Sequence, residues 1–132
     1  MLLKGKTAII SGGAGVRGIG FRTAQLFAEH GARVAILDMD AKAAADAAAS
    51  IGSEHLGLAC DVTDHAACQK AVAHVLSSFG QIDILINNAG ITQPLKVMEI
   101  SGENWDRVLD VNLKGILNLS QAVIPHMRSR KS

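Results

Sequence analysis

Residues 11–20 read SGGAGVRGIG and directly follow a short apolar run, TAII, at residues 7–10. This order predicts a strand, a glycine-rich loop and a helix that starts at Gly18. Glycines at such a junction allow a sharp turn and bring backbone N–H groups close to a phosphate, because no Cβ stands in the way. Small and apolar residues recur at helical spacing and would let the helix pack closely on a sheet: Gly20, Ala24, Phe27, Ala28 and Gly31. The stretch therefore has the pattern of a dinucleotide site.

Glycines alone do not distinguish a dinucleotide loop from an ordinary glycine-rich turn. A nucleoside-triphosphatase loop is disfavoured, because no Gly-Lys-Ser or Gly-Lys-Thr follows Gly18 to supply a lysine and a magnesium-binding hydroxyl. The choice between the remaining interpretations depends on residues further along the chain.

The composition predicts one soluble globular domain of 132 residues, of which 48% are hydrophobic, with a net charge of +1. Thirteen basic residues against twelve acidic ones give neither a basic patch nor an acidic tail, so no nucleic-acid partner is expected. The N-terminus becomes charged too early for a signal peptide, and no apolar run approaches membrane-spanning length. We therefore expect a cytoplasmic protein with no membrane partner.

Apolar runs and helical periods alternate along the chain. They predict strands at 7–10, 33–38, 55–61 and 82–86, and helices from 18, at 41–51, from 63 to 79 and at 103–127. Alanine dominates 41–51, and Thr63 is the expected N-cap of the third helix. This order specifies an α/β fold of Rossmann type, a doubly wound parallel sheet with helices on both faces.

The cysteines and histidines form no metal-ligand pattern. Cys60 and Cys68 lack a Cys-x-x-Cys spacing and are expected to be reduced, buried thiols. The five histidines, at positions 30, 55, 65, 74 and 126, are scattered, so each is expected at the surface or at an edge. No metal site is predicted.

Asp38 stands twenty residues after Gly18, at the end of the second predicted strand. A carboxylate there can accept hydrogen bonds from both hydroxyls of an adenosine ribose. The alternative is that Asp38 caps the alanine-rich helix, for which Asp40 is at least as well placed. With the glycine loop upstream, we favour the ribose role.

Five motifs in this order resemble the short-chain dehydrogenase/reductase family, and together they span the whole chain. They are the glycine loop ending Gly18-Ile19-Gly20, Asp38, Asp61-Val62, Asn87-Asn88-Ala89-Gly90 and Val111-Asn112. A methyltransferase could share the glycines and the ribose-binding acid, but not the Asn-Asn-Ala-Gly turn.

The resemblance implies a bound NAD and a role for the first two motifs. Gly12, Gly18 and Ile19 would line the pyrophosphate. Asp38 would bind the adenosine ribose. In some relatives the position of Arg17 carries a basic residue that meets the extra phosphate of NADP, but Asp38 would face the ribose directly, so NAD is favoured over NADP.

The later motifs would complete this site. By resemblance, Asp61 and the Val62 backbone would border the adenine. Asn88, Ala89 and Gly90 would run under the middle of the cofactor.

The glycine loop departs from the family pattern. Five residues separate Gly12 from Gly18, where the family usually has three, and the opening threonine is Ser11. Which of Gly12, Gly13 and Gly15 makes the turn is therefore left open.

The resemblance also implies an oxidoreductase that acts on an alcohol or a ketone with a serine, a tyrosine and a lysine. The chain has no tyrosine. We therefore interpret residues 1–132 as the cofactor-binding half of such an enzyme, incomplete at its C-terminus after the long helix that follows the fourth strand. Asn112 is the one catalytic candidate, because the matching asparagine holds a water in a proton relay at a helix break; the alternative is a satisfied polar residue in a helix core.

The last helix carries apolar residues on more than one face, including Leu113, Leu117 and Ile124. Such a helix is normally buried on several sides, and in relatives it joins a helix bundle between subunits, so we expect a homo-oligomer. Trp105, at helical spacing with Val108, is expected in the core. The alternative function is a non-catalytic dinucleotide-binding or interaction module.

Overall fold

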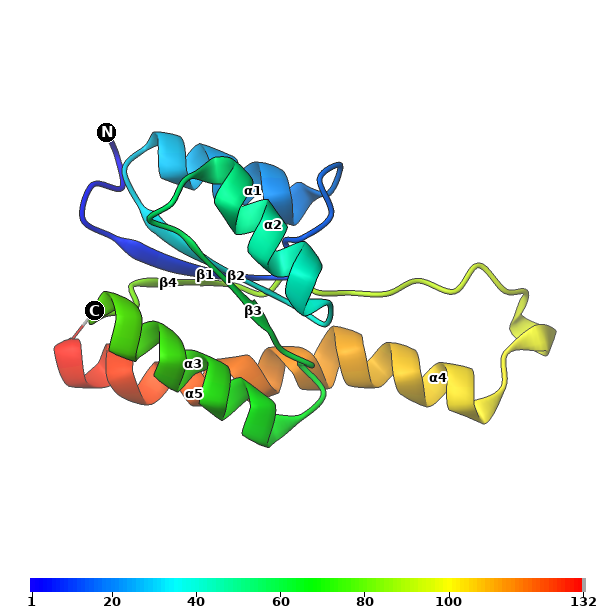
Figure 1. Ribbon diagram of the computed structural model, residues 1–132. Helices are drawn as coiled ribbons and strands as arrows, with labels where there is room; N and C mark the ends of the chain where they lie inside the picture. Colours follow the sequence, from blue (N-terminus) through cyan, green and yellow to red (C-terminus); the bar gives the residue numbers. More distant parts are fainter. Residues whose placement is uncertain (132) are drawn as a thin grey trace.

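The computed structural model describes residues 1–131; Ser132, the end of the predicted domain, lies outside them. Strands and helices alternate as the sequence predicts (Figure 1). The elements are β1 (Thr7–Ser11), α1 (Ile19–Glu29), β2 (Arg33–Asp38), α2 (Ala41–Ile51), β3 (Leu56–Ala59), α3 (His65–Phe79), β4 (Ile84–Ile86), the short η1 (Val97–Glu99), α4 (Gly102–Leu109), the π-helical segment η2 (Asp110–Lys114) and α5 (Gly115–Arg130).

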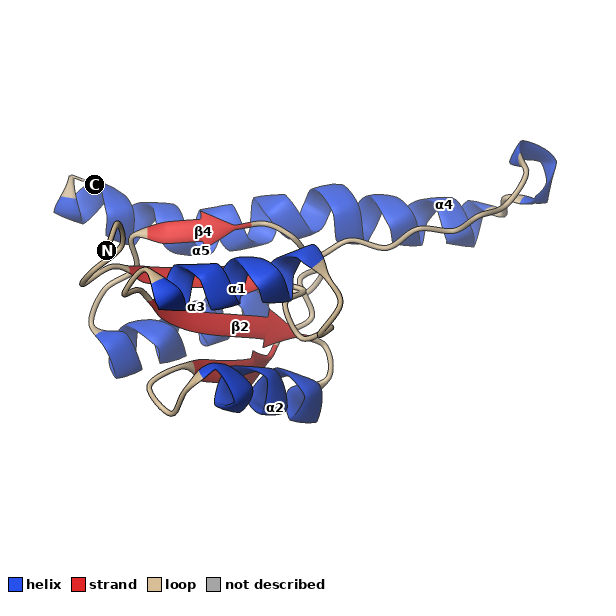
Figure 2. Cartoon of the chain, turned by 90° about the horizontal axis from the view of Figure 1, so that it is seen from above, coloured by secondary structure: helices blue, strands red, loops and turns tan. Residues whose placement is uncertain are grey.

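The four strands form one parallel sheet in the order β3-β2-β1-β4. From β1 the chain first adds β2 and β3 on one side and then places β4 on the other side of β1 (Figure 2). The strand order therefore reverses beside β1. Ligands of such sheets bind outside the carboxyl ends of the strands at this switch point. The predicted Rossmann-type α/β fold is confirmed.

Helices cover both faces of the sheet, α1 and α2 on one and α3 and α5 on the other (Figure 1). Neighbouring residues of a strand point toward opposite faces of the sheet, because side chains alternate along a strand. Ile10 and Ile36 pack with α1 and α2, whereas Ile9 and Leu37 pack with α3 and α5. This double coverage explains why the strands read as continuous apolar runs.

Two aspartates begin the middle helices. Asp40 accepts a hydrogen bond from the Ala43 N–H at the start of α2. Asp64 does the same for the Ala67 N–H at the start of α3. The prediction of Thr63 as that N-cap is wrong, because its hydroxyl instead donates to the Asp61 carboxylate over 2.7 Å.

The predicted continuous helix at 103–127 is interrupted by η2, which separates α4 from α5. Helix α4 and the loop before it project beyond the sheet (Figures 1 and 2). The prediction that Trp105 lies in the core is wrong for this reason: its side chain sits on the projecting helix and is 57% exposed. On α5, Leu119 and Val123 are buried, while Ile116, Leu117 and Ile124 remain exposed.

Two histidine side chains accept hydrogen bonds from backbone N–H groups. His55 directly precedes the edge strand β3, in keeping with the expected surface or edge position, although its side chain is only 2% exposed. Its Nδ1 accepts a hydrogen bond from the Val34 N–H at 3.1 Å. His126 of α5 accepts the Ile82 N–H through Nε2.

The start of β4 is tied to the end of α5. Asp83 accepts hydrogen bonds from the Thr7 N–H and from Gln81, and Arg130 pairs with it at 2.8 Å. Burial raises the pKa of the Asp83 carboxyl, but these donors outweigh burial and hold it below its ordinary value.

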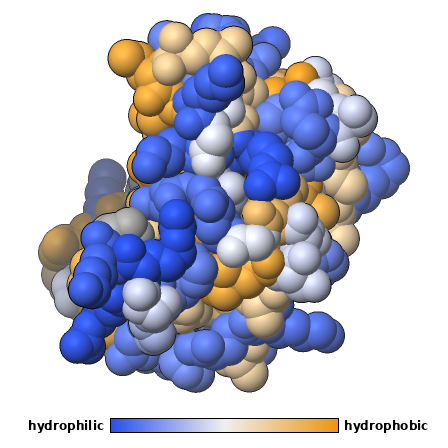
Figure 3. Space-filling model, turned by 90° about the vertical axis from the view of Figure 1, so that its left-hand side faces the viewer, coloured by the Kyte–Doolittle hydropathy of each residue, from blue (hydrophilic) through white to orange (hydrophobic). Residues whose placement is uncertain are grey.

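The end of the molecule where both termini lie is hydrophilic with separate hydrophobic patches (Figure 3).

Candidate functional site

A cavity of about 850 Å³ opens at the carboxyl ends of the strands. Each strand contributes a residue at or after its end: Gly12 from β1, Asp38 from β2, Cys60 from β3 and Asn88 from β4. The full lining is Gly12, Leu37, Asp38, Met39, Cys60, Asp61, Val62, Thr63, Asn88, Ala89, Gly90, Ile91, Glu103, Asp106, Arg107, Asp110 and Val111. The cavity therefore lies at the switch point of the sheet.

Gly12 makes the turn out of β1. Its φ of +68° lies in the left-handed region that favours glycine. A Cβ there would also lie 2.8 Å from the Cα of Ala89. Gly13 and Gly15 do not have positive φ, so the turn belongs to Gly12 and the choice left open by the sequence is resolved.

Ser11 and Asn88 connect the loops after β1 and β4. The Ser11 hydroxyl oxygen accepts hydrogen bonds from the N–H groups of Asn88 and Ala89, at 3.1 and 3.0 Å. In return, the Asn88 side-chain amide donates to the Gly12 carbonyl at 3.1 Å. This reciprocal pattern holds one wall of the cavity in place. Sequence reasoning noted Ser11 only as a departure from the family's threonine and missed this role.

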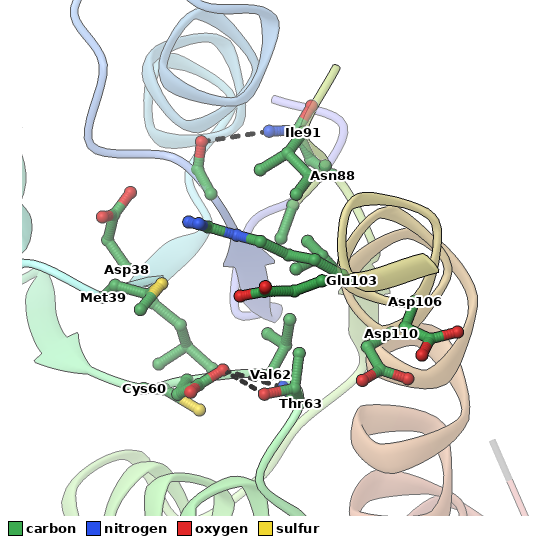
Figure 4. A pocket seen from close by; sticks show the side chains of 17 residues that line it. Asp38, Met39, Cys60, Val62, Thr63, Asn88, Ile91, Glu103, Asp106 and Asp110 are labelled. Carbon is green, nitrogen blue, oxygen red and sulfur yellow. Dashed lines mark hydrogen bonds between the residues drawn. The ribbon is translucent and has the colours of Figure 1, made fainter. Parts of the chain in front are cut away.

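Asp38 stands at the end of β2 with its side chain beside the cavity, near Met39 (Figure 4). Its carboxylate accepts one hydrogen bond, from the Asp40 N–H at 3.2 Å. Because Asp40 caps α2, the alternative of Asp38 as the helix cap is wrong. The remaining acceptor capacity of Asp38 can serve a ligand.

The loop after β3 forms the opposite wall (Figure 4). The Asp61 carboxylate accepts from both the N–H and the hydroxyl of Thr63, which folds the loop into a local turn. The Val62 carbonyl accepts the side-chain amide of Asn118, a buried residue of α5, at 2.8 Å. Asp61 and Val62 are therefore held in place by contacts within the protein.

One face of α4, continued by the first residue of η2, completes the lining, and sequence reasoning missed it. Glu103, Asp106, Arg107 and Asp110 recur at helical spacing, which is the signal that could have identified a common face. With Asp38 and Asp61, the lining holds five carboxylates and one guanidinium. An acidic lining favours ligand groups that donate hydrogen bonds over further anionic groups.

Arg17, Gly18 and Ile19 lie apart from these residues. They border a smaller hollow of about 340 Å³ with Arg22 and others at the start of α1. Gly18 is the N-cap of α1 in an extended conformation, and its N–H donates to the Gly15 carbonyl at 2.8 Å. The structure thus brings seven of the ten predicted cofactor residues to one cavity and these three to another.

Asn112 lies in η2 and does not line the cavity. Its side-chain oxygen accepts the Ile91 N–H at 2.9 Å, and its amide donates to the Ile91 carbonyl at 3.0 Å. Asn112 therefore fixes the loop after β4 to the helix break. π-Helical segments are rare, and they are frequently found at functional sites.

The sequence matches the family model for short chain dehydrogenases over residues 6–132. The chain belongs to the short-chain dehydrogenase family. The resemblance of the five motifs is thereby confirmed.

Several short-chain dehydrogenases are similar over nearly the whole chain. A short-chain type dehydrogenase/reductase of Sinorhizobium fredii is 58% identical over 97% of this chain and 52% of its own length. A sorbitol dehydrogenase of Cereibacter sphaeroides is 45% identical, over 93% and 47% respectively. The crystal structure of a 3-ketoacyl-(acyl-carrier-protein) reductase from Brucella melitensis, complexed with NADH, has a TM-score of 0.92 and 38% identity, and the match covers 97% of this chain and 52% of that one. The chain thus spans about half the length of these relatives.

Two further findings concern the described residues of this member of the family. Residues 1–131 hold no group of three or more histidine, cysteine, aspartate or glutamate side chains arranged to bind a metal ion. Over the same residues, every helix is too short or too polar to cross a membrane.

Proposed function

We propose that this chain is the dinucleotide-binding part of an NAD-dependent oxidoreductase that acts on an alcohol or a ketone. The observation that carries the proposal is the cavity in which Gly12, Asp38 and Asp61 meet at the ends of three adjacent strands. The names of the relatives, a sorbitol dehydrogenase and a 3-ketoacyl reductase, support the substrate class.

The residues fit a pyrophosphate at the turn after β1. Gly12 keeps this part of the cavity free of a side chain, and Gly18 starts α1 with its first N–H groups unsatisfied by a side-chain cap. Such N–H groups and the helix dipole favour an anion. In this proposal the pyrophosphate extends from the main cavity at Gly12 toward the smaller hollow, where Gly18 and Ile19 line it and Arg17 is near it.

The opposite part of the cavity suits a ribose and an adenine. Asp38 would accept the ribose hydroxyls, and Asp61 with the Val62 backbone would border the adenine. Asn88, Ala89 and Gly90 would follow the middle of the dinucleotide. When bound, the nicotinamide group supplies hydride transfer.

Asp38 and the acidic lining favour NAD over NADP. A carboxylate about 4 Å from the extra phosphate of NADP would be repelled by roughly 1–3 kcal/mol after screening. Among the lining residues, Arg107 carries the one positive charge, whereas five residues carry carboxylates.

The proposal assigns no complete catalytic set to this chain. Asn112 is its one candidate for catalysis, as a positioning residue at the helix break. The family's tyrosine has no counterpart, because the chain contains none. General acid–base catalysis contributes about 10² to 10⁴ in rate, so purified chain should give no cofactor-dependent absorbance change with alcohols or ketones.

We also propose self-association through the exposed apolar residues of α4, η2 and α5. Trp105 of α4, Leu113 of η2 and Leu117 of α5 are each more than half exposed. A surface of this kind on a soluble chain marks an interaction site. A second copy is the proposed partner.

Titration calorimetry with NAD and NADP tests the cofactor proposal. NAD should bind more tightly than NADP, and Asp38→Ala should narrow the gap. Asp46→Ala is the matched control, because Asp46 is an exposed aspartate on α2 that pairs with Lys42, outside the cavity. Equal or tighter binding of NADP by the unmodified chain would contradict the proposed role of Asp38.

A further inference from the structure

The chain's two cysteines lie in contact beneath the cavity. Cys60 follows β3 and Cys68 lies in the first turns of α3, and their sulfur atoms are 3.8 Å apart. Both are free thiols, 4% and 0% exposed, in the core between the sheet and α3. Because the chain contains two cysteines in all, each has the other as its single possible intramolecular partner.

The geometry is close to that of a disulfide. The bond requires a sulfur–sulfur distance of about 2.0 Å, so the two atoms must approach by roughly 1.8 Å. The Cys68 sulfur already points back toward the loop after β3, since it lies 3.6 Å from the Val62 carbonyl oxygen and 3.9 Å from that of Asp61. Bond formation therefore requires the two side chains, or the start of α3, to move so that this gap closes.

The two thiols differ in access and in acidity. Cys60 lines the cavity, on the side of Val62 and Thr63 (Figure 4), whereas Cys68 lies behind it. The contact with the Cys68 sulfur lowers the pKa of Cys60 against the opposing effect of burial, and the same contact, together with burial, raises the pKa of Cys68. Cys60 is therefore the better nucleophile, because the thiolate is the reactive form.

We propose that Cys60 and Cys68 form an oxidation site, at which a hydroperoxide that enters the cavity converts the two thiols into a disulfide. The Cys60 thiolate attacks one peroxide oxygen, and the O–O bond breaks. Cys60 becomes a sulfenic acid, and the other oxygen leaves as hydroxide or alkoxide. The Cys68 sulfur then bonds to the Cys60 sulfur, and the sulfenic hydroxyl leaves with the Cys68 proton as water. The two thiols lose two electrons in total, and the hydroperoxide gains them.

The site is coupled to the cavity through its position. Asp61, Val62 and Thr63 directly follow Cys60 and form the wall above it. A ligand that fills the cavity would close the path of the peroxide to Cys60. This coupling rests on the proposed function, whereas the disulfide itself does not.

Peptide mapping of the reduced chain after treatment with hydrogen peroxide tests the disulfide. The protein is unfolded after treatment, blocked with N-ethylmaleimide and digested. Trypsin leaves both cysteines in one peptide, residues 43–70, whereas cleavage before Asp61 and Asp64 separates them. We expect a mass loss of about 2 Da in the tryptic peptide, no maleimide adduct, a cross-link between the two separated fragments, and full reversal by dithiothreitol. Two maleimide adducts, stable addition of oxygen without a cross-link, or a cross-linked dimer would each overturn the proposal.

Single variants assign the order of events. In Cys68→Ser, dimedone should trap a sulfenic acid at Cys60, and in Cys60→Ser the Cys68 thiol should remain open to maleimide after the same treatment. Equal reactivity of the two variants toward peroxide would overturn Cys60 as the attacking residue. The mapping of the unmodified chain remains decisive if either variant fails to fold.

Oxidation in the presence of saturating NAD tests the coupling, with calorimetry as the separate check that NAD is bound. Bound NAD should slow disulfide formation at least several-fold. An unchanged rate with NAD bound would overturn the coupling. Absence of NAD binding in calorimetry would instead contradict the proposed function, and the mapped disulfide would stand.

Discussion

A Cβ atom at Gly12 would lie 2.8 Å from the Cα of Ala89. Gly12 follows β1 and Ala89 follows β4, so the two loops that leave adjacent strands touch backbone to backbone at the cavity. This contact requires a residue without a side chain. It also explains why the left-handed turn falls on Gly12 and not on the glycines that follow it.

Gly12→Ala should destabilise the protein and remove dinucleotide binding. The positive φ costs about 1–2 kcal/mol for alanine, and the contact with Ala89 adds about 1–3 kcal/mol of overpacking. Gly15→Ala is the matched control, because Gly15 lacks a positive φ and a Cβ there would meet nothing within 4 Å. Urea unfolding should show a loss for the first variant and a change within about 0.5 kcal/mol for the second. Equal stability of the two variants would contradict the geometry of this turn.

Asn112 should control the opening of the loop after β4. Asn112→Ala removes both hydrogen bonds to Ile91, at a cost of about 1–3 kcal/mol, so the Ile91 amide should lose its protection from hydrogen exchange. Asn112→Asp keeps an oxygen that can accept the Ile91 N–H but loses the donor to the Ile91 carbonyl, so it should retain part of that protection. If the alanine variant exchanged as slowly as the unmodified chain, Asn112 would not hold this loop.

His55 should make the fold less stable in mild acid. Burial lowers the pKa of His55, with Glu54 acting in the opposite direction, and its Nδ1 must be unprotonated to accept the Val34 N–H. As the pH falls, the histidine of the unfolded chain takes up a proton at about pH 6.5. The folded histidine takes it up only at a lower pH. The stability that neutral His55 contributes is therefore fully present above the pKa of the unfolded histidine, and it is lost as the pH falls through the lower pKa of the folded one.

The measurement is the free energy of unfolding between pH 7.5 and pH 5, roughly the range in which histidine titrates. His55→Gln should lower the stability at the upper end and flatten the pH dependence relative to the unmodified chain. Identical slopes for both proteins would show that His55 does not contribute.

The exposed apolar residues of α4, η2 and α5 should drive association at micromolar concentration. Each large side chain that leaves water contributes about 1.5–3 kcal/mol. Leu117→Glu should shift the sedimentation profile toward the monomer, whereas Ala45→Glu, on the exposed side of α2, should leave it unchanged. A monomeric profile for the unmodified chain, together with a sharp cooperative melt, would contradict the proposed interface.

Local patterns were sufficient to predict the order of the elements and the parallel sheet. Apolar runs such as residues 33–38 can be buried on both sides only in a sheet with helices on two faces, as found for β2. Strand order indicated Asp38, and the resemblance to the short-chain family indicated Gly12, Asp61 and Asn88. All four line the cavity, because the carboxyl ends of parallel strands lie at one edge.

Other features depend on contacts that no local pattern contains. Trp105 fits a core period, but α4 projects beyond the sheet that would have covered it. His55 is buried by its bond to Val34, a residue twenty-one positions away. The separation of Arg17 from the main cavity follows from the path of the lengthened glycine loop, which the spacing of glycines does not specify.

The central claim is that the cavity at the strand ends is the dinucleotide site. Titration of the isotope-labelled chain with NAD, followed by amide chemical shifts, tests it residue by residue. The account predicts saturable shifts at Gly12, Asp61, Val62, Ala89 and Gly90, with the exposed face of α2 around Ala45 unaffected. Saturable shifts confined to any other surface, or no shifts at millimolar NAD, would contradict it.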